Sequence, residues 1–190
     1  MTDEILAERT RQGSSAAFAA LVARHCDAVY RIAGNICTSA SDAEEVTGQT
    51  FLSAYRDAGS RPSDSSFRIW LYGIAMKKAS RQRERASRGQ AVWLEAFLPG
   101  FDADGGLEPG GEWPELGAAR LEQMNVAGFL REALDDMDER VRAAFVLCDL
   151  AQLPAEDAAA IVQASPEVIR ARVHRARLML RGLLDRLWSV

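Results

Sequence analysis

The sequence lacks several features that would indicate a membrane or secreted protein. No uninterrupted apolar run approaches the roughly 18 residues that a membrane-spanning helix needs, so we expect no membrane insertion. The first residues alternate acidic and basic side chains without an apolar segment, so we expect no secretory signal. The three cysteines, Cys26, Cys37 and Cys148, are odd in number and form no CxxC pair. They predict free thiols in a reducing, cytoplasmic environment rather than disulfides.

Lysine and runs of β-branched residues are also scarce, whereas alanine and arginine are common. Only Lys77 and Lys78 are lysines among the 23 basic residues, and alanine is the commonest residue type with 32 copies. Alanine and arginine both favour helices. With 48% hydrophobic and 26% charged residues, the composition is typical of a globular protein. The sequence therefore predicts an all-α fold.

Helix-breaking residues divide the chain into three parts. Residues 91–117 contain six glycines, three prolines and six acidic residues but no basic residue, which excludes a regular helix there. We therefore expect two small four-helix domains, residues 1–90 and 118–190, joined by an irregular acidic linker. The linker also contains tryptophans and phenylalanines, so parts of it should lie against a domain or a partner. Few contacts should cross between the two domains.

The net charge of −4 conceals two basic segments. Residues 61–90 have a net charge of +6 and residues 161–190 of +4, whereas residues 91–160 between them have −11. Two basic segments on a weakly acidic chain indicate two separate surfaces that contact anions. A chain coated with nucleic acid over its whole surface would instead be basic overall.

The second basic segment has the pattern of a helix-turn-helix. After a helix expected over 139–150, a short alanine-rich helix over 154–162, a three-residue turn and a basic helix over 165–188 follow one another. The apolar spacing of the basic helix predicts a buried face made of Ile169, Val173, Ala176 and Leu180. The residues that then point outward are the candidate contacts to duplex DNA in the major groove: Glu167, Arg170, Ala171, His174, Arg175 and Arg177.

Different roles are expected within this outward face. Arg170 is placed to reach a guanine edge, while Arg175 and Arg177 should contact backbone phosphates. The alternative is a solvated amphipathic face, but such faces usually interleave acidic residues for pairing one turn apart. Only Glu167 and Asp185 are acidic in this helix, which favours contact with DNA.

The first basic segment predicts a helix over 67–87 with an aromatic start and a cationic end. Aromatic rings beside cations suit unpaired nucleotides, because every base can stack and every nucleotide carries a phosphate. Each ring taken alone is more readily explained as a core residue, so both interpretations stay open. The candidate contacts to a melted strand are Phe67, Trp70, Tyr72, Lys77, Lys78, Arg81 and Arg85.

Several segments, in this order along the chain, resemble an extracytoplasmic-function (ECF) sigma factor, the small two-domain class of bacterial transcription initiation factors. These segments are DAEEVTGQTFLSAY, WLYGIA and FVLCDLAQLPAEDAAAIVQASPEVIRARVHRAR. The resemblance covers nearly the whole chain apart from the linker. It implies a sigma factor that binds core RNA polymerase and directs promoter-specific transcription initiation.

The resemblance also assigns roles to the two domains. The N-terminal domain would bind polymerase and then melt and read the minus-ten element, while the C-terminal domain would read the minus-thirty-five element. The polymerase-binding signature of the family falls on a helix that we expect to open with the capping box Ser41-Asp42-Ala43-Glu44. The residues that it places on the polymerase are Asp42, Glu44, Glu45, Gln49, Phe51 and Leu52. The partners implied are core RNA polymerase, duplex and melted promoter DNA, and an anti-sigma factor.

Motifs for catalysis are missing. The sequence has no GxxxxGK, HExxH, CxxC or GxSxG motif, so we expect a protein that is not an enzyme and needs no cofactor or metal. One alternative is a stand-alone helix-turn-helix regulator that binds duplex DNA directly, which would leave the first basic helix unexplained. A second alternative is a protein-interaction module that binds through the acidic linker. Promoter binding by the chain alone, or only with core polymerase, distinguishes these functions.

Overall fold

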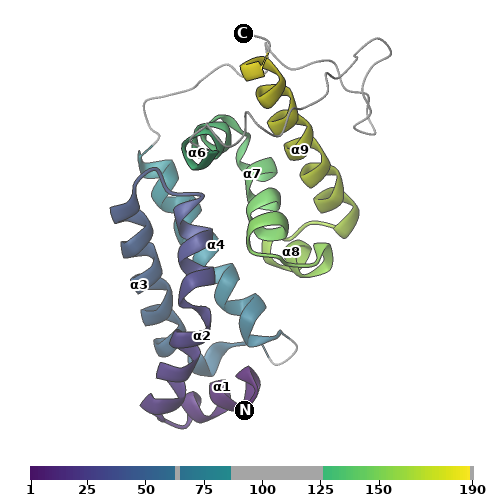
Figure 1. Cartoon of the computed structure of the whole chain (residues 1–190). Helices are drawn as coiled ribbons and strands as arrows, with labels where there is room; N and C mark the ends of the chain where they lie inside the picture. The colour runs from purple at the N-terminus through teal and green to yellow at the C-terminus, as the bar shows by residue number, and fades with distance from the viewer. Residues whose placement is uncertain (63–64, 87–125, 189–190) are drawn as a thin grey trace.

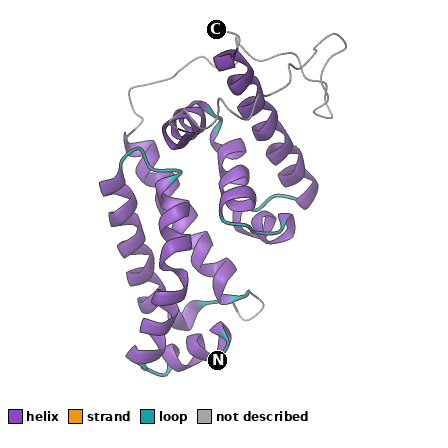
Figure 2. Cartoon of the chain, in the orientation of Figure 1, coloured by secondary structure: helices purple, strands orange, loops and turns teal. Residues whose placement is uncertain are grey.

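The computed structural model describes residues 1–62, 65–86 and 126–188, so the linker predicted over 91–117 lies outside the described residues. Within the described ranges the regular structure is helical without a strand, as the composition predicts (Figure 2). The elements in chain order are α1 (Asp3–Arg11), α2 (Ser15–Gly34), α3 (Ala40–Arg56), the 3-10 turn η1 (Ala58–Ser60), α4 (Phe67–Ala86), α6 (Val126–Asp136), α7 (Glu139–Phe145), the π-helical turn η3 (Val146–Leu150), α8 (Ala155–Val162) and α9 (Pro166–Trp188).

Helices α1 to α4 form the N-terminal lobe. Figure 1 shows α2, α3 and α4 side by side, with α1 at one end of the bundle. The apolar stripe of α2 supplies the centre, where Leu21, Val29 and Ile32 are fully excluded from solvent. Burial of this stripe against α3 and α4 removes its apolar surface from water, at about 25 cal/mol for each Å² buried.

The first turn of α3 is capped two residues earlier than the sequence suggests. Ser39 is the N-cap: its Oγ accepts the Asp42 N–H at 3.1 Å and donates to the Asp42 carboxylate at 2.7 Å. The predicted cap, Ser41, lies inside the helix. Both serines stand three residues before an acidic residue, so the local pattern alone does not distinguish them.

Helices α6 to α9 form the C-terminal lobe. In this lobe the Arg142 side chain caps the C-terminus of α6. Its side chain is buried, and Nη1 donates to the carbonyls of Leu134 at 2.9 Å and Met137 at 3.2 Å. These bonds satisfy carbonyls that a helix C-terminus leaves without partners. Burial lowers the pKa of Arg142 to about 10, and the nearby Arg83 guanidinium acts in the same direction. Arg142 therefore remains a cation at neutral pH.

The second helix of this lobe changes geometry midway. The sequence predicts one helix over 139–150, but the α-helix ends at Phe145 and continues as the π-helical turn. There the Ala151 N–H donates to the Val146 carbonyl at 2.8 Å, which is the bond of a wider turn. Val146 and Leu147 stay buried in this arrangement, while Asp149 is directed toward α9. Turns of this kind are frequent at functional sites.

The predicted helix-turn-helix is formed by α8, α9 and the turn between them. Pro154 precedes α8 rather than opening it, and Ser165 caps α9 by accepting the Val168 N–H at 3.4 Å. Gln163 ends α8 in the left-handed conformation, at φ 55° and ψ 50°. This conformation costs roughly 1–2 kcal/mol for residues with a Cβ, and glycine is the residue that usually adopts it after a helix.

The two lobes pack against each other, with α8 beside α4 in Figure 1. One core cluster runs across both lobes, because Phe67 and Leu71 of α4 belong to the same cluster as Leu147 and Ala158. This corrects the expectation that few contacts cross between the domains. Helix breakers mark a boundary along the sequence, but they carry no information about which apolar faces meet in space.

Two arginines of α4 form ion pairs across the contact between the lobes. Arg68 Nη2 lies 3.0 Å from the Asp157 carboxylate on α8. Arg83 Nη1 lies 2.7 Å from the Asp135 carboxylate and 3.1 Å from the Ile36 carbonyl, and its Nη2 donates to the Asp135 carbonyl at 2.9 Å. The Arg83 side chain is 13% exposed and that of Arg68 is 45%, so solvent weakens the Arg83 pair less.

The left-handed turn at Gln163 yields a stability prediction. Gln163→Gly should raise the free energy of unfolding by about 0.5–1 kcal/mol, because glycine adopts this conformation without the steric cost of a Cβ. Thermal unfolding followed by circular dichroism should show a rise in Tm of about 2–4 °C. The matched control is Gly13→Ala at φ 95°, where the change in Tm should have the opposite sign. An unchanged or lower Tm for Gln163→Gly would show that the turn carries no strain.

Candidate nucleic-acid and polymerase interfaces

The candidate DNA contacts of α9 lie on its exposed face, as the apolar spacing predicts. Ile169, Val173 and Ala176 are buried in the lobe, and Leu180 is half-buried. Met179 is a further buried residue, which the predicted stripe does not include. The exposed side chains on the opposite side are Glu167, Arg170, Ala171, His174, Arg175 and Arg177.

Arg170, the predicted reader of a guanine edge, is held by two carboxylates. Its Nη1 lies 3.0 Å from Glu156 on α8, and its Nη2 lies 3.1 Å from Glu167 on α9. The Glu156 pKa is lowered by a hydrogen bond from its own backbone and then by Arg170. All three side chains are more than half exposed, so a base edge can replace either carboxylate at little cost. The sequence analysis missed Glu156, because it lies on a different helix.

Arg177, a predicted phosphate contact, forms a two-pronged ion pair. Its Nε and Nη2 donate to the two carboxylate oxygens of Asp149 at 2.9 Å and 2.7 Å. The hydrogen bonds that Arg177 donates to Asp149 raise the Arg177 pKa. Asp149 sits in the π-helical turn and is 20% exposed, so the pair also ties this turn to α9. A phosphate that binds Arg177 must therefore compete with Asp149 or share the guanidinium with it.

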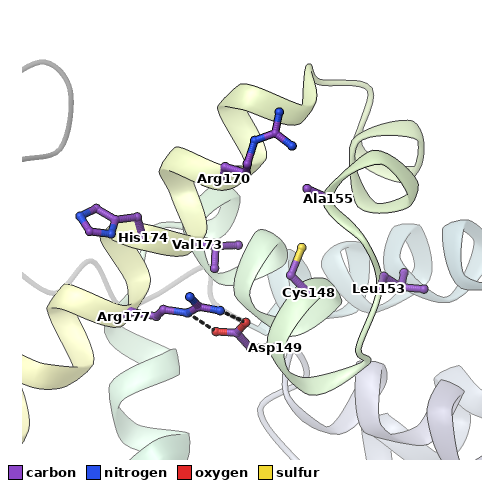
Figure 3. Close-up of a pocket in the computed structure, with 8 residues that line it drawn as sticks. All are labelled: Cys148, Asp149, Leu153, Ala155, Arg170, Val173, His174 and Arg177. Atoms are coloured by element: carbon purple, nitrogen blue, oxygen red, sulfur yellow. Dashed lines mark hydrogen bonds and ion pairs between the residues drawn. The ribbon is translucent and has the colours of Figure 1, made fainter.

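These side chains surround an open hollow of about 420 Å³ between α9 and the π-helical turn. Figure 3 shows Arg170, His174 and Arg177 on α9, with Arg177 bonded to Asp149 and Cys148 nearby. Burial raises the Cys148 pKa, so its thiol is protonated at neutral pH. The lining of the hollow combines Arg170 and Arg177, each paired with a carboxylate, with the Cys148 thiol and apolar side chains.

Arg175 differs from its neighbours in α9. Its side chain is exposed and has no hydrogen-bond or ion-pair partner among the described residues. It is therefore available to a phosphate without first breaking an ion pair with a described residue.

The three aromatic rings predicted to meet a melted strand are not equally available. Phe67 is 3% exposed and Tyr72 is 5% exposed, so both are core residues in this structure. Phe67 packs on His25 and Trp70 with ring centroids 5.7 Å and 5.9 Å apart. Burial raises the Tyr72 pKa. The face of α4 that carries these two rings packs into the lobe. Of the two interpretations that the sequence leaves open, their burial favours core residues. Trp70 is half-buried.

The cations of α4 fall into two groups. Lys77, Arg81 and Arg85 are exposed and Lys78 is half-buried, so the cationic end of the helix reaches solvent as predicted. Arg83 instead joins the lobes through Asp135. Arg83 is therefore withdrawn from any nucleic-acid surface, and Arg68 is held by Asp157 in the same contact.

The predicted polymerase contacts lie on α3, and most face solvent. Glu44, Glu45 and Gln49 are exposed, with Gln49 Nε2 donating to Glu45 at 2.7 Å. Asp42 is half-buried, because it caps the helix with Ser39 and accepts a hydrogen bond of 2.6 Å from Gln82. Asp42 therefore positions the start of α3 and is less available to a partner.

The apolar residues of this helix divide between the core and the surface. Phe51 is 7% exposed and packs edge-on against Phe18, which places it in the core rather than at an interface. Leu52 is 59% exposed, as a polymerase contact requires. Tyr55, one turn further on, is 45% exposed and was missed by the sequence analysis. Leu52 and Tyr55 make an apolar pair beside polar side chains, which is the usual anatomy of a protein interface.

Other kinds of site find no support in the described part of the chain. No cluster of three or more histidine, cysteine, aspartate or glutamate side chains there could hold a metal ion. His25 instead bonds to Asp3 at 2.8 Å and lies 3.5 Å from the Tyr72 hydroxyl. Among the described helices, none combines the length and apolarity needed to span a membrane.

Comparisons with known proteins agree with this division into two lobes. Residues 21–89 match the sigma-70 region 2 family, and residues 130–180 match sigma-70 region 4. The chain is 31% identical over 186 residues to the RNA polymerase sigma factor CnrH of Cupriavidus metallidurans, covering 96% of this chain and 94% of that protein. It is 30% identical over 187 residues to the ECF RNA polymerase sigma-E factor of Escherichia coli, covering 93% and 91%.

Two solved structures have a similar fold. The structure of CnrH in complex with the cytosolic domain of CnrY has a TM-score of 0.71 at 28% identity, covering 97% of each chain. The sigma factor RpoE in complex with the anti-sigma factor NepR, from Bartonella quintana, has a TM-score of 0.62 at 23% identity. It covers 88% of this chain and 96% of that one.

The burial of Phe67 yields a prediction that separates a core ring from a nucleic-acid contact. Phe67→Ala should lower the free energy of unfolding by about 3–5 kcal/mol, because it leaves a cavity beside His25 and Trp70. Urea unfolding measures this loss. Lys77→Ala, on the exposed side of the same helix, should change the free energy by less than about 0.5 kcal/mol. A Phe67→Ala protein as stable as the wild type would place the ring at the surface.

Proposed function

This chain belongs to the extracytoplasmic-function family of RNA polymerase sigma factors, and on that basis we propose how its surfaces share the work of transcription initiation. It is a sigma factor that directs RNA polymerase to promoters by reading minus-ten and minus-thirty-five elements. Because the chain matches both region 2 and region 4, the alternative of a stand-alone helix-turn-helix regulator is not favoured. The protein acts by binding rather than by catalysis, in the cytoplasm where the polymerase works.

The minus-thirty-five element is the proposed ligand of the helix-turn-helix. The observation that carries this assignment is the exposed arginine face of α9, opposite the stripe in which Ile169, Val173 and Ala176 are buried. The N-terminal part of such a helix enters the major groove, so Arg170 is placed over base edges. Arg175 and Arg177 lie further along the helix, where the phosphate backbone passes.

The minus-ten element is the proposed ligand of α4. Lys77, Lys78, Arg81 and Arg85 offer cations to the phosphates of a melted strand. Trp70 is the ring with surface left for stacking, since the other two are core residues. The sequence offers three rings as candidates for stacking on bases, whereas this proposal keeps only Trp70.

Core polymerase is the proposed partner of α3. Leu52 and Tyr55 supply an exposed apolar pair, and Glu44, Glu45 and Gln49 supply the polar surroundings. An anti-sigma factor is a further proposed partner, because both similar solved structures are complexes with a second protein.

The packed lobes must separate for both promoter elements to be read at once. Elements centred near positions −10 and −35 are about 85 Å apart along B-DNA, at about 3.4 Å for each base pair. In this structure α4 and α8 are in contact, so the two reading surfaces lie much closer together. The chain between Ala86 and Val126 can span about 130 Å when fully extended, at about 3.3 Å for each residue. The connection therefore permits the separation that the promoter requires.

The function is tested by promoter binding with and without core polymerase. Specific binding should require core polymerase, and Arg170→Ala should cost roughly 1–3 kcal/mol and relax the preference at one or two upstream base pairs. Arg175→Ala should weaken binding to all sequences alike and reduce the salt slope by about one. Gel-shift titrations over a range of salt measure both effects. Equal losses for the two variants on every sequence would contradict direct base reading by Arg170.

The lobe contact is tested by breaking its less exposed ion pair. Asp135→Asn removes the carboxylate between Arg83 and Arg142 and leaves two neighbouring guanidinium groups without it. The salt concentration at which the lobes separate should therefore fall, as measured by the radius of gyration in small-angle X-ray scattering. Glu8→Gln breaks the Arg11 pair on α1, away from the lobe contact, and is the matched control. Identical salt profiles for Asp135→Asn and wild type would show that this pair does not hold the lobes.

A further inference from the structure

The first turn of α9 carries an exposed valine that the fold does not explain. Val168 is 41% exposed and is the one large hydrophobic side chain so exposed in the described part of the C-terminal lobe. A β-branched residue in an exposed helix position is a poorer helix former than alanine or glutamate. Neither core packing nor helix propensity therefore explains a valine at this position.

The backbone around Val168 holds its side chain in one place. Ser165 Oγ accepts the Val168 N–H, which caps the helix at this residue. A β-branched side chain in a helix has one strongly preferred rotamer, so the two methyl groups form a rigid apolar surface. Binding through such a surface loses little conformational entropy.

Val168 and its neighbours form an apolar strip on one flank of the reading face. Ala171 is exposed and lies three residues on, which places it on the same side of the helix. Arg175 lies a further turn along this flank and has no partner among the described residues. Arg170 and Arg177 lie on the other flank, where Glu156 and Asp149 hold them. The paired arginines and the apolar strip thus occupy opposite sides of the same face.

The major groove offers one apolar group to such a strip. Among base edges in this groove, the C5-methyl of thymine is the group that an alanine, a threonine methyl or a similar side chain contacts. A phosphate would gain nothing from a valine, and a guanine edge presents only hydrogen-bond acceptors. We infer that Val168, with Ala171 beside it, is a specificity-determining residue that recognises thymine methyl groups in the upstream element. This inference rests on the proposed function, in which α9 lies in the major groove.

The test removes the methyl group from the DNA and its partner from the protein. Holoenzyme formed with core polymerase first selects preferred upstream sequences from a random library. Each thymine of the preferred sequence, on either strand, is then replaced by deoxyuridine, which differs only by the missing methyl. Wild-type affinity should fall about fourfold at one or two positions, the size expected for one buried methyl group.

The protein variants identify the residue that senses the methyl. Val168→Thr keeps the β-branched shape, and Val168→Ala improves helix propensity, so both should fold, as circular dichroism can verify. Both variants should reduce the fourfold difference between thymine and deoxyuridine at the sensitive positions. Val168→Ala should reduce it more than Val168→Thr, because threonine keeps one of the two methyl groups. Ala160→Ser, an exposed change on α8, is the control and should keep the fourfold difference.

Each contrary outcome has a distinct meaning. A preferred sequence without a deoxyuridine-sensitive thymine overturns the inference and leaves the proposed function standing. A uniform loss of affinity in the Val168 variants, with the deoxyuridine effect retained, also overturns it and indicates that the valine contacts polymerase. A library that yields no preferred upstream sequence overturns the proposed function itself.

Discussion

The packing of α4 is the constraint on which the other features depend. This helix contacts α2 and α3 on one side and α8 on another, and Phe67 and Leu71 join a core that extends across both lobes. A helix buried on so much of its circumference has little surface left for nucleic acid. That surface is the cationic end, where Lys77 and Arg81 remain exposed. The same packing that builds the core thus determines which side chains can meet a melted strand.

Several arginines of this protein are paired with carboxylates from other elements. Arg68, Arg83 and Arg177 each bond to an aspartate far away in sequence. For Arg170 and Arg177, binding to DNA then becomes an exchange of one anionic partner for another, whereas Arg175 binds as an unpaired cation. Such an exchange yields less free energy than contact by an unpaired cation, since the internal pair must be broken or shared. Pairing of arginines with carboxylates also explains how a chain with a net charge of −4 can carry arginine-rich surfaces that contact nucleic acid.

The sequence predicts features that depend on local periodicity and misses those that depend on distant neighbours. Ile169, Val173 and Ala176 follow helical spacing, so the outward face of α9 could be derived before its packing was known. The partnership of Asp149 with Arg177 could not, because a π-helical turn redirects the carboxylate. The burial of Tyr72 was also missed, since outward and inward positions near the start of α4 depend on where α2 lies. Helical spacing sorts residues into faces, but only the tertiary structure says which faces are covered.

The two flanks of α9 suggest why an apolar contact would be useful for promoter choice. An arginine that is already paired gains only the difference between its old and new partners, which lowers the free energy that Arg170 and Arg177 gain from contact with DNA. Val168 has no partner to give up, and the free energy it gains depends directly on whether a methyl group faces it. This gain is also insensitive to salt, whereas every phosphate contact weakens as salt rises. Base selection by an apolar residue would therefore persist under conditions in which the arginines contribute less.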